Sequence, residues 1–156
     1  MVEALHERVA LVGYVTTSAG FAATSKTSAT IDMDIFRRAI VILQGKVATT
    51  LATTHGGLTL KIFDSGATGT MPSTAVISCT GLQLTTTTRG YQTIAEVRSE
   101  QLGTVATGST YGRFFRARVV GTTLKAIANV IVLGGDCRYN PASDHDLSSV
   151  AEIKSS

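Results

Sequence analysis

The chain of 156 residues contains no tryptophan, only two cysteines and two prolines, and few aromatic residues. Cys79 and Cys137 lie far apart, and neither has a partner at a metal-ligand spacing. This argues against a disulfide framework and predicts two buried free thiols. No apolar run approaches the roughly 20 residues of a membrane helix, and acidic Glu3 and Glu7 stand where a secretory signal is basic. We therefore expect one soluble domain without an export signal.

Charged residues are also scarce. They make up 16% of the chain, the net charge is +3, and acidic and basic residues are interspersed. This mild positive balance favours an acidic partner without requiring nucleic acid. Threonine, serine, alanine and glycine are abundant instead. Such a surface suits a particle component whose faces are largely covered by neighbours.

Frequent threonine and valine favour extended segments over helices, because β-branched side chains are stiff. Eight strands are predicted, at residues 8–15, 28–33, 36–48, 58–63, 75–84, 91–99, 113–121 and 125–135. Each short strand must cover one apolar face against a second sheet. The predicted fold is therefore all-β, an eight-stranded β-sandwich or jelly roll.

The predicted domain covers residues 1–140, followed by a C-terminal arm over 141–156. Residues 16–28 are small and polar and are expected to form a flexible loop or a mobile arm. Residues 120–126 read as a tight hairpin between the last two strands, and residues 51–58 are expected to turn on Gly56–Gly57.

No motif that could support catalysis is complete. Gly20–Thr27 resembles a phosphate-binding loop, but Ser25 occupies the second glycine position and no helix-forming segment follows. No Gly-x-Ser-x-Gly elbow is present, and Cys79 reads as an inward strand residue. Glu96 and Glu100 lack the aromatic-rich cleft of a glycosidase. We expect no enzyme activity, no small-molecule substrate and no cofactor.

The three histidines, His6, His55 and His145, lie far apart in the sequence. Asp144 and Asp146 flank His145, but neighbouring side chains on an extended strand point to opposite faces, so the three rarely converge on one ion. We expect no metal site. One of the two aspartates could instead cap a short helical turn.

Arginines recur on the predicted strands. Within residues 113–121, Arg116 and Arg118 alternate with apolar residues, and this period of two puts both guanidinium groups on one face. Guanidinium groups bind carboxylates as readily as phosphates, and few aromatic residues lie nearby for base stacking. We therefore favour a protein interface over nucleic acid as the partner of these arginines, and a solvated face is the other alternative. The arginines are Arg37, Arg38, Arg116 and Arg118.

Residues 141–156 are predicted to be an arm that grips a neighbouring subunit. Pro141 stops the last strand, and Asp144 and Asp146 offer carboxylates to arginines or backbone amides. The apolar anchors of the arm are Leu147, Val150 and Ile153. The spacing of its apolar residues fits a helix or a strand, so periodicity leaves the conformation open.

Three stretches carry motifs in a recognisable order. They are IDMDIFRRAIVIL (31–43), VRSEQLG (97–103) followed by YGRFFRARVV (111–120), and VLGGDCRYNPASDHDLSSVAEI (132–153). Together they resemble a family of small virion proteins of tailed bacteriophages and prophages that are found near the major capsid protein. The first 30 residues and residues 64–74 lie outside the resemblance.

The resemblance implies a cement, or decoration, protein on the surface of an icosahedral capsid, assembled in the host cytoplasm. Its partner would be the major capsid protein, and its copies would form a dimer or trimer on the shell. The resemblance carries over no active site. From the residues themselves we expect no specific nucleic acid and no membrane partner. The alternative is a jelly-roll module of a phage tail or fibre that binds carbohydrate or another tail protein, which the scarcity of aromatic residues disfavours.

Overall fold

The structure is a computed structural model that describes residues 9–16, 25–47, 56–84, 91–104, 112–121 and 126–137. Its strands are β1 (Ala10–Thr16), β2 (Ser25–Thr27), β3 (Ile31–Asp32), β4 (Phe36–Val47), β5 (Gly56–Ser65), β6 (Ile77–Leu84), β7 (Tyr91–Arg98), β8 (Phe114–Gly121) and β9 (Ala126–Cys137). A 3-10 turn, η1 (Ser99–Gln101), follows β7. Within the described residues, no helix is long and apolar enough to cross a membrane.

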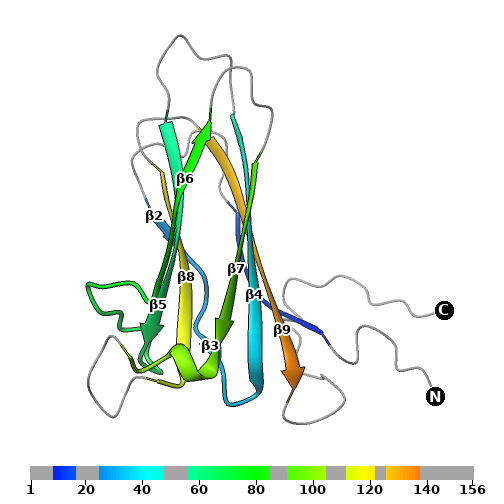
Figure 1. The fold of residues 1–156 in the computed structure, drawn as a ribbon, viewed down its shortest axis with the longest axis vertical. Coiled ribbons are helices and arrows are strands. Elements are labelled where there is room, and N and C mark those ends of the chain that lie inside the picture. The colour runs from blue at the N-terminus through cyan, green and yellow to red at the C-terminus, as the bar shows by residue number, and fades with distance from the viewer. Residues whose placement is uncertain are drawn as a thin grey trace, which may run out of the picture.

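The strands form two antiparallel sheets that lie face to face (Figure 1). Sheet A has the order β1-β9-β4-β7, and sheet B has the order β2-β8-β5-β6, with β3 also paired to β8. The strand pairs are nested, since β1 pairs with β9, β2 with β8, β4 with β7, and β5 with β6. Pairing of β4 with β9 and of β5 with β8 rolls this ribbon into two sheets. This is a jelly roll, and the predicted all-β class is confirmed.

The hydrophobic core lies between the two sheets. Its residues alternate along each strand with outward-facing ones, as the two-residue period of a strand requires. Each fully buried aliphatic or phenyl side chain contributes about 1.5–3 kcal/mol relative to exposure. The central core residues are Ala39, Val41, Leu43, Ala128, Val130 and Val132 from sheet A and Leu58, Leu60, Ile62, Phe115, Ala117 and Val119 from sheet B.

Two neighbouring glycines on β9 show how differently the two faces of sheet A are packed. A Cβ atom on Gly134 would stand 2.7 Å from the ring of Phe36, which is itself buried in the core. A Cβ atom on Gly135 would have nothing within 4 Å. Gly134 therefore leaves the space that Phe36 fills, whereas Gly135 is not constrained by packing.

A buried carboxylate joins two loops at the end of the jelly roll. Asp64 is fully buried, and its side chain accepts hydrogen bonds from the backbone N–H groups of Gly103 and Gly112. These glycines have φ angles of 79° and 98°, and a Cβ atom on Gly103 would stand 3.3 Å from the Cα atom of Gly112. Because the two backbones approach so closely, glycine is needed there and Asp64 has a structural role.

Seven of the eight predicted strands correspond to long observed strands, but the region before β4 differs. The loop or arm predicted over residues 16–28 is wrong at its end, because Ser25–Thr27 forms β2, paired with β8, and Ser28 is buried. The strand predicted over 28–33 shrinks to the two residues of β3. These short strands form because their backbones pair with β8. Their small polar side chains show no alternation that would have predicted them. Residues 17–24 lie outside the described residues.

Both predicted turns are also wrong. β8 belongs to sheet B and β9 to sheet A, so residues 120–126 do not close a hairpin but connect the two sheets. Gly56 and Gly57 lie within β5, opposite Leu84 and Gln83 of β6. A period of two shows that a segment is a strand, but it does not show which strand is its neighbour. In a jelly roll most consecutive strands belong to different sheets.

Candidate interaction surfaces

Charged side chains gather at one end of the jelly roll, where β7 and β9 finish and β4 and β8 begin (Figure 1). Five acidic groups and three arginines there form ion pairs with one another. We call this group the charged end, and its members are Asp32, Asp34, Arg38, Glu96, Arg98, Glu100, Arg113 and Asp136. The end carries both signs of charge in a chain that has little charge overall.

Arg113 fixes the turn between β3 and β4 to the start of β8. Its Nε lies 2.9 Å from Asp32 Oδ1, its Nη2 binds Asp32 Oδ2, and its Nη1 lies 3.1 Å from Asp34 Oδ2. Hydrogen bonding to Asp32 raises the pKa of Arg113. The guanidinium also lies 4.8 Å from the ring centroid of Phe114. This two-pronged contact gives the charged end a defined geometry.

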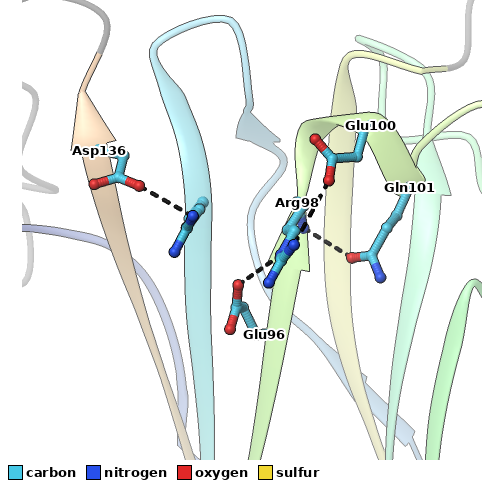
Figure 2. Close-up of polar contacts among 6 residues, drawn as sticks. Glu96, Arg98, Glu100, Gln101 and Asp136 are labelled. Carbon is cyan, nitrogen blue, oxygen red and sulfur yellow. Dashed lines mark hydrogen bonds and ion pairs between the residues drawn. The ribbon is translucent and has the colours of Figure 1, made fainter.

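Arg38 and Arg98 are cross-strand partners on β4 and β7, and each is paired with a carboxylate. Arg38 Nε lies 3.0 Å from Asp136 Oδ2. Arg98 Nε lies 2.8 Å from Glu96 Oε1, and its Nη1 lies 3.8 Å from Glu100 Oε1 (Figure 2). These side chains are about half exposed or more, so the pairs add little stability. They orient charges toward solvent, where a partner could meet them.

Local interactions position the carboxylates of Glu96 and Asp136 in these ion pairs. The hydrogen bond from Arg98, together with its charge, lowers the pKa of Glu96 below its ordinary value of 4.5. Asp136 has a φ angle of 51°, in the left-handed region that Asp and Asn adopt more readily than most other residues. This conformation near the end of β9 accompanies the contact of its carboxylate with Arg38.

The charged end is built from the stretches that carry the sequence resemblance. Residues 31–43, 97–103, 111–120 and 132–153 supply all of its charged side chains except Glu96. β9, which precedes the predicted C-terminal arm, also ends there. The predicted arm residues lie outside the described part of the chain; these are Pro141, Asp144, Asp146, Leu147, Val150 and Ile153.

The two arginines predicted to face a partner on β8 both contact their own chain. Arg116 donates from Nε to the Ser28 carbonyl oxygen at 2.9 Å and from Nη1 to the Gly69 carbonyl oxygen at 3.0 Å. Arg118 donates from Nη2 to Ser25 Oγ at 2.6 Å. Both guanidinium groups lie on the outer side of sheet B, as the period predicted. Arg116 connects the segments of Ser28 and Gly69 to β8. Their role in an interface stays a prediction.

The predicted arginines of β4 reach the surface. Arg37 and Arg38 are both exposed, and Arg38 belongs to the charged end. The structure therefore places Arg38 with Arg98 and Arg113, and it places Arg116 and Arg118 apart from them on sheet B.

The outer side of sheet A carries an apolar surface that the sequence analysis missed. One cross-strand row runs from Tyr14 through Ile131 and Ile42 to Ile94, and the adjacent row contains Leu11, Leu133 and Ile40. We call these seven residues the apolar face. Tyr14, Ile40 and Ile94 are 46%, 44% and 64% exposed, and they are the large exposed hydrophobic residues of the described chain.

Polar residues border the apolar face on two sides. Arg38, Glu96 and Arg98 of the charged end lie at one border. At the other border a cross-strand row of amide and hydroxyl groups contains Thr16, Asn129, Gln44 and Gln92. An open groove of about 420 Å³ lies near this second border, lined by Tyr14, Thr16, Gln44, Asn129 and Ile131 among others.

A sequence signal for the apolar face exists. Residues 39–43 and 130–133 are uninterrupted apolar runs, AIVIL and VIVL. A strand with one side in water alternates apolar and polar residues, whereas a strand covered on both sides is apolar throughout. The two central strands of sheet A therefore have the composition of strands that are covered on both sides.

The structure places several of the residues that the sequence analysis considered for chemistry. No group of three or more His, Cys, Asp or Glu residues among them could hold a metal ion. Cys79 is a free thiol that packs against the core, as predicted, although it is partly rather than fully buried. Lys26 and Thr27 lie on β2, where a phosphate-binding loop would require the start of a helix.

Comparisons with known proteins give distant structural likenesses. No family model matches the chain, and no curated protein matches its sequence. The chain is similar to the infectious bursal disease virus VP2 subviral particle, with a TM-score of 0.48 and 14% identity, over 85% of this chain and 33% of that chain. It is also similar to a Desmodium yellow mottle tymovirus structure, with a TM-score of 0.40 and 6% identity, over 86% and 91% of the two chains. This chain spans about a third of the length of the VP2 chain, and likenesses at this level do not indicate what it binds.

Proposed function

We propose that the chain is a structural protein of a bacteriophage virion, a cement protein that clamps adjacent major capsid protein subunits at the capsid surface. The proposal starts from the sequence resemblance. The observation that carries it is the meeting of the resembling stretches at the charged end, where β9, the last described strand, also ends. A rigid jelly roll with its docking groups at one end suits a role that needs contact area rather than catalysis.

The charged end would dock by exchanging partners. Its ion pairs are exposed and weak, so a capsid carboxylate can replace Glu96 on Arg98, or Asp136 on Arg38, at little cost. Arginine suits this exchange because its planar group binds carboxylates in a bidentate manner. Charges of both signs select a partner with the complementary arrangement and reject others.

The predicted arm would extend this contact. A specific interface buries about 800 Å² on each partner, which is more than one end of a small jelly roll easily presents. Residues 141–156 would add apolar anchors and carboxylates beside the charged end. A segment that orders on docking can cover a large area on a neighbouring subunit.

Removing the arm tests this proposal. A chain that ends at Tyr139 should retain its circular dichroism spectrum and melting behaviour but lose most of its occupancy on capsid shells, measured by co-sedimentation. Unchanged occupancy would refute the docking role of the arm. Electron microscopy of intact particles locates the protein. Density over the junctions of capsid subunits would support the role as a cement protein. Density on the tail or a fibre would favour the alternative function.

Charge reversal tests the charged end. The double variant Arg38→Glu and Arg98→Glu should weaken docking more at low salt than at high salt, because exposed charges are screened. Lys26→Glu is the control, since Lys26 is exposed on β2 away from this end. Reversal of Arg116 and Arg118 should show the same salt dependence if they also face a partner. Equal weakening at both salt levels would indicate misfolding, because both arginines bind their own chain.

A further inference from the structure

The apolar face is large enough to form a small protein interface. Four strands about 4.8 Å apart, and the seven residues from Gln92 to Arg98 at about 3.4 Å each, give a surface of roughly 20 Å by 20 Å. A contiguous exposed apolar patch of a few hundred Å² is often functional. Two such surfaces in contact bury about 400 Å² on each copy, or about 800 Å² in total, which is the range of weak and transient pairs. We therefore expect a weak, reversible association.

The arrangement of residues on this surface makes it complementary to itself. The groove beside Tyr14 lies toward the β1 edge, and Ile94, the most exposed large apolar residue, lies on β7 at the opposite edge. A two-fold axis parallel to the strands brings β7 of one copy over β1 of the other. Ile94 of each copy then enters the groove of its partner, and this happens twice because the contact is isologous.

The polar borders also suit a second copy under the same rotation. The row of Thr16, Asn129, Gln44 and Gln92 meets its own copy, and amide groups both donate and accept hydrogen bonds. At the other border, Arg98 approaches the side of the sheet that carries Asp136 in the partner. A border of one sign would repel a copy and require an oppositely charged partner, but this border carries both signs.

We propose that the apolar face binds a second copy of this chain, so that two A sheets pack face to face with Ile94 of each copy in the groove beside Tyr14 of the other. The two sheets have the same twist, and sheets of equal twist pack well when their strands are nearly aligned. The inference goes beyond the proposed function and does not depend on it. It names the contact by which two copies associate, whatever they bind.

Sedimentation velocity of the full chain over a range of concentrations tests the proposal. The chain should be a reversible dimer, and Ile94→Lys should raise its dissociation constant at least about 100-fold, because the symmetric contact loses two apolar anchors at once. Ile94→Leu keeps the anchor and should stay close to the unchanged chain. Thr80→Lys is the matched control, since Thr80 is exposed on β6, an edge strand of sheet B. A chain that stays monomeric at millimolar concentration, or a dimer that Ile94→Lys leaves intact, overturns the proposal.

A mixing experiment tests the orientation of the pair. Ile94→Asp and Tyr14→Lys should each abolish self-association, because each places charges in an apolar contact. A mixture of the two variants should associate again, since one contact of the mixed pair is unaltered and the other joins opposite charges. Continued absence of association in the mixture, with both variants folded by circular dichroism, overturns the proposed arrangement.

Binding to capsid shells separates this inference from the proposed function. If the chain forms the dimer but does not bind shells, the inference stands and the cement function is wrong. A monomer whose attachment to shells is abolished by Ile94→Lys assigns the apolar face to a shell protein and overturns the dimer.

Discussion

The outer faces of the two sheets differ in the side chains that they carry and in what those side chains contact. The outer face of sheet B carries Arg116 and Arg118, whose guanidinium groups bind backbone and side-chain oxygens of residues 25–28 and of Gly69. The outer face of sheet A carries two rows of apolar side chains, with Ile94 64% exposed. One face is therefore occupied by its own chain, whereas the other offers side chains that water solvates poorly.

This difference changes how an arginine-bearing strand is interpreted. Positive charge at every second residue of β8 indicates an outward face, but the same guanidinium groups can hold nearby loops instead of a partner. Uninterrupted apolar runs on β4 and β9 are the stronger indication of an interface, because both faces of such strands require cover. Three pairs of variants and one titration test how the side chains of these regions are held, and they follow from the largest expected effect to the smallest.

The first pair compares the two faces of one strand. Gly134→Ala should lower the free energy of unfolding by about 3 kcal/mol, because the new methyl group overlaps the buried ring of Phe36. Gly135→Ala should change it by less than about 0.5 kcal/mol, since no atom lies near. Urea unfolding followed by circular dichroism measures both values. Equal losses in the two variants would mean that β9 is not oriented as described.

The second pair compares the two arginines of β8. Arg116→Leu should cost about 1–2 kcal/mol, because the carbonyl groups of Ser28 and Gly69 both lose a charged donor. Arg118→Leu should cost about 0.5–1 kcal/mol, since one hydrogen bond to Ser25 is lost. The same unfolding experiment applies. A larger loss for Arg118→Leu would show that β2 contributes more to stability than the segments that Arg116 joins.

The sequence predicted the strands well because each long strand carries its own pattern. Alternation in residues 113–121 and the apolar runs of β4 and β9 depend only on local side chains, and the corresponding strands are observed. β2 and β3 carry no such pattern and exist because β8 offers them backbone partners. The order of strands in each sheet depends on contacts between distant segments, so the predicted hairpin at 120–126 failed.

The candidate surfaces were predicted less completely. Arg38 reaches the charged end, but the ion pairs of Arg98 with Glu96 and of Arg113 with Asp32 required knowledge of which strands meet. The apolar face required the cross-strand register, since Tyr14 and Ile94 belong to strands at opposite edges of sheet A. The apolar runs of β4 and β9 indicate that both sides of these strands are apolar, but the set of residues that forms the surface depends on the register between strands.

The third pair tests the backbone at the charged end. Asp136→Val should cost about 1–2 kcal/mol, because a β-branched residue is strained at a φ angle of 51°. Asp136→Asn tolerates this conformation and loses only an exposed ion pair with Arg38, so it should cost less than about 0.5 kcal/mol. Thermal unfolding of both variants distinguishes backbone strain from charge. Similar losses would show that the ion pair, and not the conformation, determines the effect.

The smallest effect concerns the protonation of Glu96. Its pKa lies below the ordinary value of 4.5, first because Arg98 donates a hydrogen bond to the carboxylate and then because of the charge of Arg98, with Arg38 contributing less. A lowered pKa in the folded state means that the stabilisation is present above the unfolded pKa and is lost as the pH falls through the folded value.

In an NMR titration of the Glu96 carboxyl group, Arg98→Gln should therefore return the pKa toward 4.5, and Arg38→Gln should move it less. Arg113→Gln should leave it unchanged, because Arg113 binds Asp32 and Asp34 instead. If Arg38→Gln produced the larger shift, Glu96 would be held mainly by the neighbouring strand, and the charged end would be a network across β4 and β7 rather than two separate pairs.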